Sequence, residues 1–271
     1  MMYTGGGAAG EARRASMSEH TLTDDERERF RRQLALTEIG EKGQARLLCG
    51  RVLIIGAGGL GSPAALYLAS AGVGALGIVD GDRLELSNLQ RQIMHRTRDI
   101  GRLKVDSAQD ALRELWPAAN VRTYAMRFSR ETARRLLADY DFVIDATDNF
   151  DAKFSIADCC HFAGKPYCHG GIWRFLGQAM TVHPGKSACY RCVFGEPPPN
   201  DGSEPQGPLG VVPGVIGSIQ AAEAIKHIVG VGEPLINRVL TFDAMRMICR
   251  TVPVKKNSQC PLCGDRPSIR A

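Results

Sequence analysis

Apolar and polar positions follow two different periods in the middle of the chain, and the two periods alternate. Apolar runs of about five residues, bounded by glycine or aspartate, predict buried strands. The segments between them carry apolar residues three and four apart and predict amphipathic helices. In order, the prediction is strand 51–55, helix 60–71, strand 75–80, helix 103–115, strand 121–125, helix 130–138, strand 142–146 and helix 152–162. This alternation predicts an α/β fold, with a mostly parallel sheet that has helices on both faces.

The patterns before and after this region are different. Residues 24–48 have a helical period with a break at Gly40, which predicts two short helices. After Gly164, strands are predicted at 166–169, 178–182, 238–242 and 247–253, with one long helix at 215–229. Strands that follow one another without helices predict an antiparallel or mixed C-terminal extension of the sheet.

Two segments have neither pattern. Residues 1–23 are of low complexity and are expected to form a disordered leader. The segment from Phe194 to Pro213 is rich in proline, which disfavours helix and central strand and predicts a mobile loop or lid. We therefore expect a single domain at 24–271, divided into N-terminal helices (24–50), a nucleotide-binding part (51–164) and a third part (165–271).

Composition narrows the class of protein. The chain has 271 residues, of which 44% are hydrophobic, and this is enough for a substantial core. The net charge of +5 is spread along the chain, so no nucleic-acid partner is expected. No apolar stretch approaches the roughly 18 residues of a membrane span, and the N-terminus has no secretory apolar segment. We expect a soluble, cytoplasmic protein with no membrane partner.

The first candidate for chemistry is a glycine-rich loop that follows the predicted strand 51–55 and opens a helix. Glycine permits a tight turn and a close approach of backbone to phosphate, and the helix N-terminus offers free N–H groups. The glycines of this loop are Gly56, Gly58, Gly59 and Gly61. Asp80 ends the next strand, at the spacing of an acid that binds ribose hydroxyls. Together these features predict a Rossmann-like nucleotide site, and taken alone they indicate NAD.

The residues after Asp80 favour a phosphate-rich ligand instead. The segment Ser87-Asn-Leu-Gln-Arg-Gln92 follows a strand that should end at the nucleotide, and Lys104 comes soon after it. We expect Arg91 to bind phosphate through its planar guanidinium and Lys104 to act as a point charge. The residues expected beside them are Ser87, Asn88 and Gln90. The alternative is an ordinary solvated basic face.

Acidic residues close the predicted strand 142–146 and the turn after it. Asp145, Asp148 and Asn149 supply hard oxygen atoms, which suit a magnesium ion that bridges nucleotide phosphates. We expect Asp148 to bind magnesium, Asn149 to lie at the nucleotide and Asp145 to make a structural hydrogen bond. The alternative is that Asp148 or Asn149 only caps the following helix.

Four of the nine cysteines form two CxxC pairs. The pairs are Cys189-Tyr-Arg-Cys192 and Cys260-Pro-Leu-Cys263. Four thiolates at this spacing predict a closed, tetrahedral, structural zinc site that holds the C-terminal tail on the domain. Two independent thiol pairs are the alternative. The other cysteines are expected to be buried, reduced thiols: Cys49, Cys159, Cys160, Cys168 and Cys249.

In this order, the motifs resemble those of the MoeB/ThiF/HesA family of adenylyltransferases, bacterial relatives of ubiquitin-activating enzymes. The resemblance covers about Asp24 to Gly264 and includes Arg31-Arg-Gln33 and Pro213-Gly-Val-Ile-Gly-Ser218. It implies ATP and magnesium in place of NAD. It also implies a partner, a ubiquitin-like sulfur-carrier protein whose C-terminal Gly-Gly carboxylate attacks the α-phosphate and releases pyrophosphate. Residues 165–271 would then bind the carrier and zinc.

The resemblance assigns roles to matching residues. It implies that Gly59 lies against the phosphates, Asp80 holds the ribose, and Asn88 and Arg91 contact phosphate. Arg32 matches an arginine that reaches across a homodimer to the γ-phosphate. The catalytic residues expected on this basis are Arg32, Arg91, Lys104 and Asp148. No general base is required, because a carboxylate is already ionised at neutral pH.

The resemblance leaves the carrier open. The small subunit of molybdopterin synthase is the carrier we expect, and carriers of thiamine, cysteine or tRNA-thiolation pathways are alternatives. Many relatives have a cysteine where this chain has Ser203, so adenylation without a covalent thiol step on this loop is expected. A separate protein should donate the sulfur, because the chain ends at Ala271 without a sulfurtransferase domain. An NAD-dependent oxidoreductase and a noncatalytic scaffold are the competing functions.

Overall fold

A single mixed sheet forms the centre of the molecule. The computed structural model describes residues 20–197 and 207–270. The strands are β1 (Arg51–Ile55), β2 (Ala75–Val79), β3 (Asn120–Tyr124), β4 (Phe142–Asp145), β5 (Tyr167–Trp173), β6 (Leu176–Val182), β7 (Arg238–Asp243) and β8 (Ile248–Pro253). Their order in the sheet is β3-β2-β1-β4-β5-β6-β7-β8. The first five strands are parallel and the last three join antiparallel, which confirms the predicted architecture.

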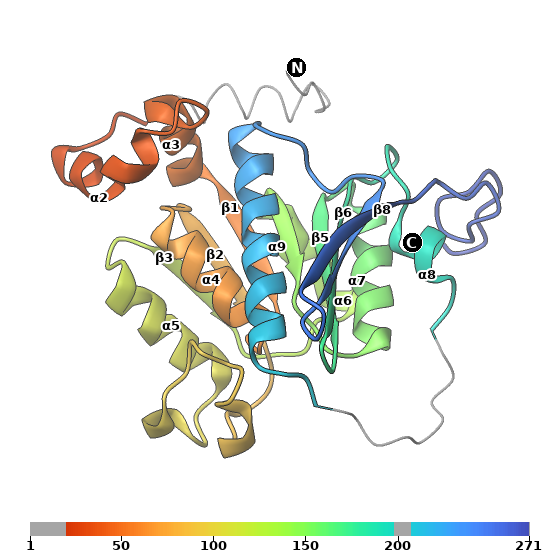
Figure 1. Ribbon diagram of the computed structural model, residues 1–271, viewed down its shortest axis with the longest axis horizontal. Helices are drawn as coiled ribbons and strands as arrows, with labels where there is room; N and C mark the ends of the chain where they lie inside the picture. Colours follow the sequence, from red (N-terminus) through yellow and green to blue (C-terminus); the bar gives the residue numbers. More distant parts are fainter. Residues whose placement is uncertain (1–19, 198–206, 271) are drawn as a thin grey trace.

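Helices cover both faces of this sheet. They are α2 (Asp24–Leu34), α3 (Gly40–Cys49), α4 (Gly61–Ser70), α5 (Lys104–Leu115), α6 (Arg130–Ala138), α7 (Phe150–Phe162), α8 (Tyr190–Phe194) and α9 (Val211–Val229), with short 3-10 turns at η1 (Leu86–Asn88) and η2 (Thr97–Asp99). Figure 1 shows α9 in front of the sheet and α6 and α7 behind it. None of the helices in the described ranges is both long and apolar enough to cross a membrane.

Alternate residues of the central strands feed two separate cores. Val52 and Ile54 of β1 belong to the core under α4, α5 and α9, whereas Leu53 and Ile55 belong to the core under α6 and α7. This is the expected result of a period of two, because successive side chains on a strand point to opposite faces. Burial on both faces also explains why these strands read as continuous apolar runs.

The N-terminal boundary differs from the prediction. Residues 1–19 of the expected leader lie outside the described residues, but residues 20–23 are ordered in the fold. Leu22 is buried, and Thr23 caps α2 in a capping box with Glu26. The leader prediction is therefore wrong at its C-terminal end, where Thr23 and Glu26 form the Thr-x-x-Glu signal of a helix N-terminus.

Other boundaries also shift. The helix α9 begins at Val211 and not at Val215, so Pro213 lies in its first turn. Proline is tolerated there because the first N–H groups of a helix have no intrahelical partner. The centre of the predicted loop, 198–206, lies outside the described residues, and Ser203 is one of them. Cys249 was expected to be buried and is exposed, because β8 is the edge strand of the sheet.

Candidate active site

A cleft of about 670 Å³ lies where the parallel strands end. Because the carboxyl ends of β1, β2 and β4 meet at one edge of the sheet, residues far apart in the sequence converge there. The residues expected to bind the nucleotide that line this cleft are Gly56, Gly58, Gly59, Asp80, Arg91, Lys104, Asp148 and Asn149. The cleft thus brings together the glycine loop, the acid at the ribose spacing, the two expected cations and the Asp148 carboxylate.

The glycine loop needs its glycines for two reasons. Gly56 has φ of +105°, and a Cβ there would lie 2.6 Å from the carbonyl oxygen of Ala146. Gly61 packs directly against the carbonyl of Gly56 and does not line the cleft. No side chain caps the first turn of α4, where Ser62 N–H donates to the Gly58 carbonyl oxygen and Pro63 has no N–H. The N–H groups of Gly58 and Gly59, just before the helix, donate to no described residue, and both glycines line the cleft, so these N–H groups are available to an anion.

Asp80 is fixed by backbone amides. Its Oδ2 accepts a hydrogen bond from the Ala57 N–H at 2.8 Å, and its Oδ1 accepts one from the Asp82 N–H at 2.8 Å. Each carboxylate oxygen has a second lone pair available for another donor. The side chain is therefore oriented by the loop itself and can receive hydroxyl groups from a ribose.

The two expected cations have different surroundings. The side chain of Lys104 is only 9% exposed, and its Nζ lies 3.1 Å from Asp82 Oδ2. Arg91 donates from Nη1 to the Ser87 carbonyl oxygen at 3.2 Å. We did not predict Asp82, although it follows Asp80 by two residues and so falls at the same edge of the sheet. The Asp82 carboxylate thus balances the positive charge of Lys104.

The polar residues at the end of β4 and just after it have three different roles. The Asn149 side chain accepts from the Ala152 N–H at 2.8 Å, so it caps α7 as the alternative reading allowed. Asp148 is exposed, lines the cleft and makes no hydrogen bond with any described residue. It is the carboxylate of this group that is free to take a cation. Asp145 is buried and structural, as expected.

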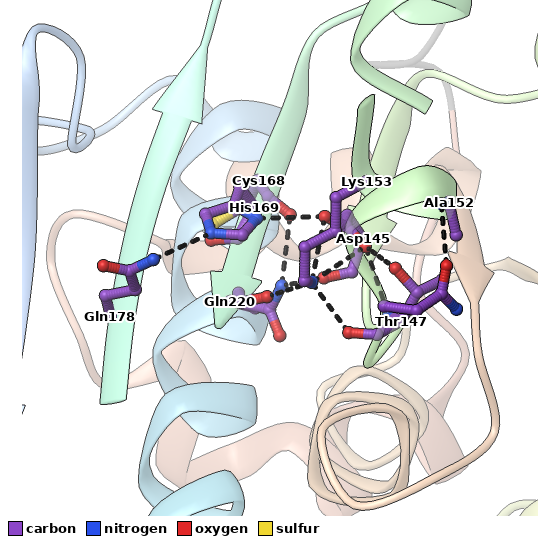
Figure 2. A network of polar contacts seen from close by, with 10 residues as sticks. Asp145, Thr147, Ala152, Lys153, Cys168, His169, Gln178 and Gln220 are labelled. Atoms are coloured by element: carbon purple, nitrogen blue, oxygen red, sulfur yellow. Dashed lines mark hydrogen bonds and ion pairs between the residues drawn. The ribbon is translucent and has the colours of Figure 1, made fainter. Parts of the chain in front are cut away.

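Asp145 is the centre of a buried polar network (Figure 2). Lys153 Nζ and Thr147 Oγ1 donate to its carboxylate, and His169 Nδ1 lies 3.0 Å from its Oδ2. Burial would raise the pKa of Asp145, but Lys153 and the hydrogen bonds from His169 and Thr147 lower this pKa to about 2. Burial and Lys153 lower the pKa of His169, so its ring is neutral and donates from Nδ1. Gln178 Nε2 faces the other ring nitrogen.

A second cleft, of about 850 Å³, lies on the other side of this network. It lies over the antiparallel strands, and its walls include Trp173, Gln178, Thr241 and Arg250. The two clefts share Asp148, Asn149 and Ile172 in their linings. They therefore meet at the carboxyl end of β4, beside the exposed Asp148 carboxylate.

Besides Gly61, four expected residues lie outside the walls of the nucleotide cleft. Ser87, Asn88 and Gln90 are in and after η1, and the Asn88 side chain accepts from the Glu85 N–H at 3.1 Å. Arg32 is exposed on α2, which lies at the end of the sheet opposite the cleft (Figure 1). A single chain does not bring Arg32 to this site.

Several residues of the cleft were not expected from the sequence. Gln92 is 4% exposed, lines the cleft, and its Oε1 has no hydrogen-bond partner among the described residues. The segment after β3 supplies a further wall: Met126, Arg127, Phe128, Ser129 and Arg130. One available signal was that β3 is also a parallel strand and therefore ends at the same edge.

The four paired cysteines form one cluster. Their sulfur atoms all lie within 4.8 Å of one another. Four of the separations are 3.3 Å to 3.7 Å, close to the roughly 3.8 Å expected between sulfur atoms at 2.3 Å from a tetrahedral zinc ion. All of these cysteines are free. The donor set fits zinc, and the reading as two separate thiol pairs is wrong because the pairs meet.

Comparison with known proteins identifies the family. The model of the ThiF family matches residues 30–262. A sulfur carrier protein adenylyltransferase of Thermus thermophilus is 42% identical over 257 residues, 92% of this chain and 94% of that protein. A SAMP-activating enzyme E1 of Haloferax volcanii is 45% identical and covers 88% of this chain and 89% of its own length. The chain belongs to the ThiF family of E1-like adenylyltransferases and is an enzyme of the nucleotidyltransferase class.

Other relatives are longer than this chain. The adenylyltransferase and sulfurtransferase MOCS3 of Arabidopsis thaliana is 45% identical over 93% of this chain but only 55% of its own length. Among solved structures, Escherichia coli MccB matches with a TM-score of 0.79 at 22% identity, over 94% of this chain and 76% of MccB. That likeness shows a shared fold.

Proposed function

We propose that this enzyme adenylates the C-terminal glycine carboxylate of a ubiquitin-like sulfur-carrier protein, with ATP as the second substrate. The carrier's carboxylate oxygen attacks the α-phosphorus, the bond to the β-phosphate breaks, and pyrophosphate leaves. The product is an acyl adenylate on the carrier. The names of two relatives support this proposal: one is a sulfur carrier protein adenylyltransferase, and the other is a SAMP-activating enzyme E1.

The observation that carries the proposal is the junction of the two clefts. ATP fits the cleft around the glycine loop, and an extended peptide fits the second cleft over the antiparallel strands. The two ligands would meet at Asp148, where both clefts have a common wall. This geometry suits a reaction between a nucleotide and a chain terminus, which need entry from different sides.

The mouth of the second cleft suits a protein partner. Trp173, Leu176 and Ile248 line it and are 56%, 43% and 47% exposed. Met245 and Met247, in the turn between β7 and β8, are about three-quarters exposed at 74% and 76%. Large apolar side chains gathered at a cleft mouth are typical of surfaces that bind another protein.

The charges in the nucleotide cleft suit attack by an anion on an anion. A carboxylate must approach a triphosphate, and negative charge builds on the nonbridging and leaving oxygens. Arg91 and Lys104 would stabilise that charge from fixed positions. Lys104 would exchange its contact with Asp82 for phosphate. Asp148 would hold magnesium, which supplies further positive charge to the phosphates when it is bound.

Asp80 would hold the ribose, with Gly56, Gly58 and Gly59 against the phosphates. Asn149 would remain a cap and a wall of the site, and Ser87, Asn88 and Gln90 would approach the nucleotide only if η1 moves.

The four-cysteine site would hold zinc in a structural role. No histidine acts as a base, and the neutral His169 belongs to the wall between the clefts.

The site is proposed to be completed in a homodimer. Arg32 lies far from the cleft of its own chain, so it would serve the γ-phosphate of a partner subunit. A separate protein would donate sulfur to the activated carrier. We propose that the reaction takes place in the cytoplasm, where the clustered thiols would stay reduced and available for zinc.

The small subunit of molybdopterin synthase is the carrier we propose, and carriers of other sulfur pathways are the second choice. An NAD-dependent oxidoreductase is disfavoured, because Arg91 and Lys104 exceed what a pyrophosphate bridge requires. A noncatalytic scaffold is disfavoured because the same cleft retains these cations together with Asp80 and Asp148.

Mass spectrometry of the carrier tests this function. Each candidate carrier is incubated with the enzyme, magnesium, ATP and pyrophosphatase, which removes the product and traps the adenylate. We expect one added AMP on the small subunit of molybdopterin synthase. The matched control is the same carrier without its final glycine, which should stay unmodified. AMP on a different carrier alone would move the proposal to that pathway.

A further inference from the structure

A buried chain of polar groups lies beneath the glycine loop. The Ala57 carbonyl oxygen is 2.8 Å from His95 Nε2, and His95 Nδ1 is 2.9 Å from Ser107 Oγ. Ser107 Oγ is in turn 3.0 Å from Asp99 Oδ2. The three side chains are 2–5% exposed, and His95 lines neither cleft. This series of polar groups therefore contacts the glycine loop from its buried side and cannot touch a ligand in the cleft.

His95 fixes the direction of one peptide group. In a trans peptide the C=O and the following N–H point in opposite directions, and the described residues contain no cis peptide. Because the Ala57 carbonyl points to His95, the Gly58 N–H points away from it. Gly58 lines the nucleotide cleft, and its N–H donates to no described residue. This N–H is therefore oriented as a phosphate donor from the buried side.

This series of polar groups has fewer hydrogens than it has hydrogen-bond contacts. A carbonyl oxygen and an ionised carboxylate only accept, so three contacts in series need three hydrogens. Neutral His95 contributes one and the Ser107 hydroxyl contributes one. Burial would raise the pKa of Asp99, but hydrogen bonds from Arg102, Ser107 and the Arg96 N–H lower it, so Asp99 stays ionised. The chain is one proton short while His95 is neutral.

The charges around His95 decide when that proton binds. Burial lowers the pKa of His95, Lys104 lowers it further, and the hydrogen bond to Ala57 together with Asp80 and Asp99 opposes this. Phosphates bound beside Lys104 would offset the effect of its charge and add negative charge above the loop. Both changes favour the imidazolium.

We propose that His95 is a positioning residue of the nucleotide site, which holds the Gly58 N–H toward the phosphates and takes up a proton when they bind. The inference rests on the proposed function in taking ATP as the ligand of this cleft. The Ser107 hydroxyl oxygen accepts the hydrogen bond from the second ring N–H and donates its own proton to Asp99, so this pair holds the ring in place.

Calorimetric titration of the enzyme with MgATP, without carrier, tests both the positioning role of His95 and its proton uptake. Titrations in two buffers of different ionisation enthalpy give the dissociation constant and the protons taken up. His95→Gln keeps a donor for Ala57 and does not titrate, so its affinity should stay within about threefold of wild type while the extra proton uptake disappears. His95→Phe has no donor and should bind ATP about tenfold more weakly, the effect of one lost hydrogen bond.

The possible results distinguish the positioning role of His95 from its proton uptake. Equal proton uptake in wild type and His95→Gln would overturn the proton linkage, since the nucleotide's own protons are the same in both. Unchanged affinity in a folded His95→Phe would overturn the positioning role. If that variant does not fold, His95→Asn, whose side chain is shorter, gives the same comparison. A wild-type enzyme that does not bind MgATP would instead refute the proposed function itself.

Discussion

The ammonium of Lys153 lies 3.3 Å and 3.4 Å from the two carboxylate oxygens of Asp145, and both side chains are buried. Lys153 also donates to the carbonyl oxygens of Thr147 and Gly170, at 2.7 Å and 2.6 Å. This one ammonium group therefore ties the end of β4 to β5 and supports the turn that carries Asp148. It holds the wall between the two clefts.

Removing this ammonium should destabilise the fold. Lys153→Met leaves the Asp145 carboxylate buried without its cation, and such a loss lowers the free energy of unfolding by about 3–5 kcal/mol. Urea denaturation measures the change. Lys42→Met is the matched control, because Lys42 is exposed on α3 and its replacement should change stability by less than about 0.5 kcal/mol. Equal effects of the two substitutions would contradict the role of the pair.

Mild acid should also destabilise the protein. Burial lowers the folded-state pKa of His161, and His95 and His169 shift in the same direction. The unfolded chain therefore binds more protons than the folded chain as pH falls through about 6.5, and the free energy of unfolding decreases. The contribution of Asp145, with its pKa of about 2, is lost only in stronger acid, below its ordinary value.

Urea titrations at pH 7.5, 6.5 and 5.5 check this slope. His161→Gln removes one titrating group outside the active site, so its stability should fall less steeply with acid than that of wild type. If the free energy of unfolding increased as the pH was lowered from 7.5 to 5.5, these histidines would not be held neutral by burial.

The parallel half of the fold was predictable because its strands are buried on both faces and its helices have a clear apolar period. The C-terminal half was predictable only in outline. The sequence Gly170-Gly171 resembles a turn, and we ended the strand at His169, yet β5 runs on to Trp173. A Cβ at Gly170 would lie 2.6 Å from the Gln220 side chain on α9, so a glycine is needed inside this strand.

The candidate site shows a similar division. Asp80, Lys104 and Asp148 could be placed from the sequence because each lies at or just beyond the edge where parallel strands end. The His95 chain could not, because it joins Ala57, Ser107 and Asp99 across three segments with no common spacing. Such contacts depend on how α5 packs against the glycine loop.

Loss of zinc should weaken the fold without directly touching the nucleotide cleft. Cys192→Ser removes one of four thiolates and should release the metal, with a melting temperature lower by about 10 °C or more. Metal analysis and thermal melts measure both effects. Cys249→Ser changes an exposed thiol outside the cluster and should alter neither. An unchanged melt after metal loss would remove the structural role.

Mixed dimers test the proposed site that two subunits would share. Arg32→Ala and Asp148→Ala homodimers should each lose exchange activity, because each lacks one part of both sites. After the two are unfolded together and refolded, about one quarter of the wild-type rate should return, since about half of the dimers are mixed and each has one intact site. No recovery in verified mixed dimers would place Arg32 outside the partner's site.

Exchange of labelled pyrophosphate into ATP is the most direct test of the proposed adenylation. We expect exchange that requires both magnesium and a carrier ending in Gly-Gly, and that falls by about 10²–10³ in Arg91→Ala, the effect of one lost donor to developing charge. Zinc content should stay unchanged in that variant. No exchange with any Gly-Gly carrier encoded in the same genome, or full exchange without Arg91, would contradict the account.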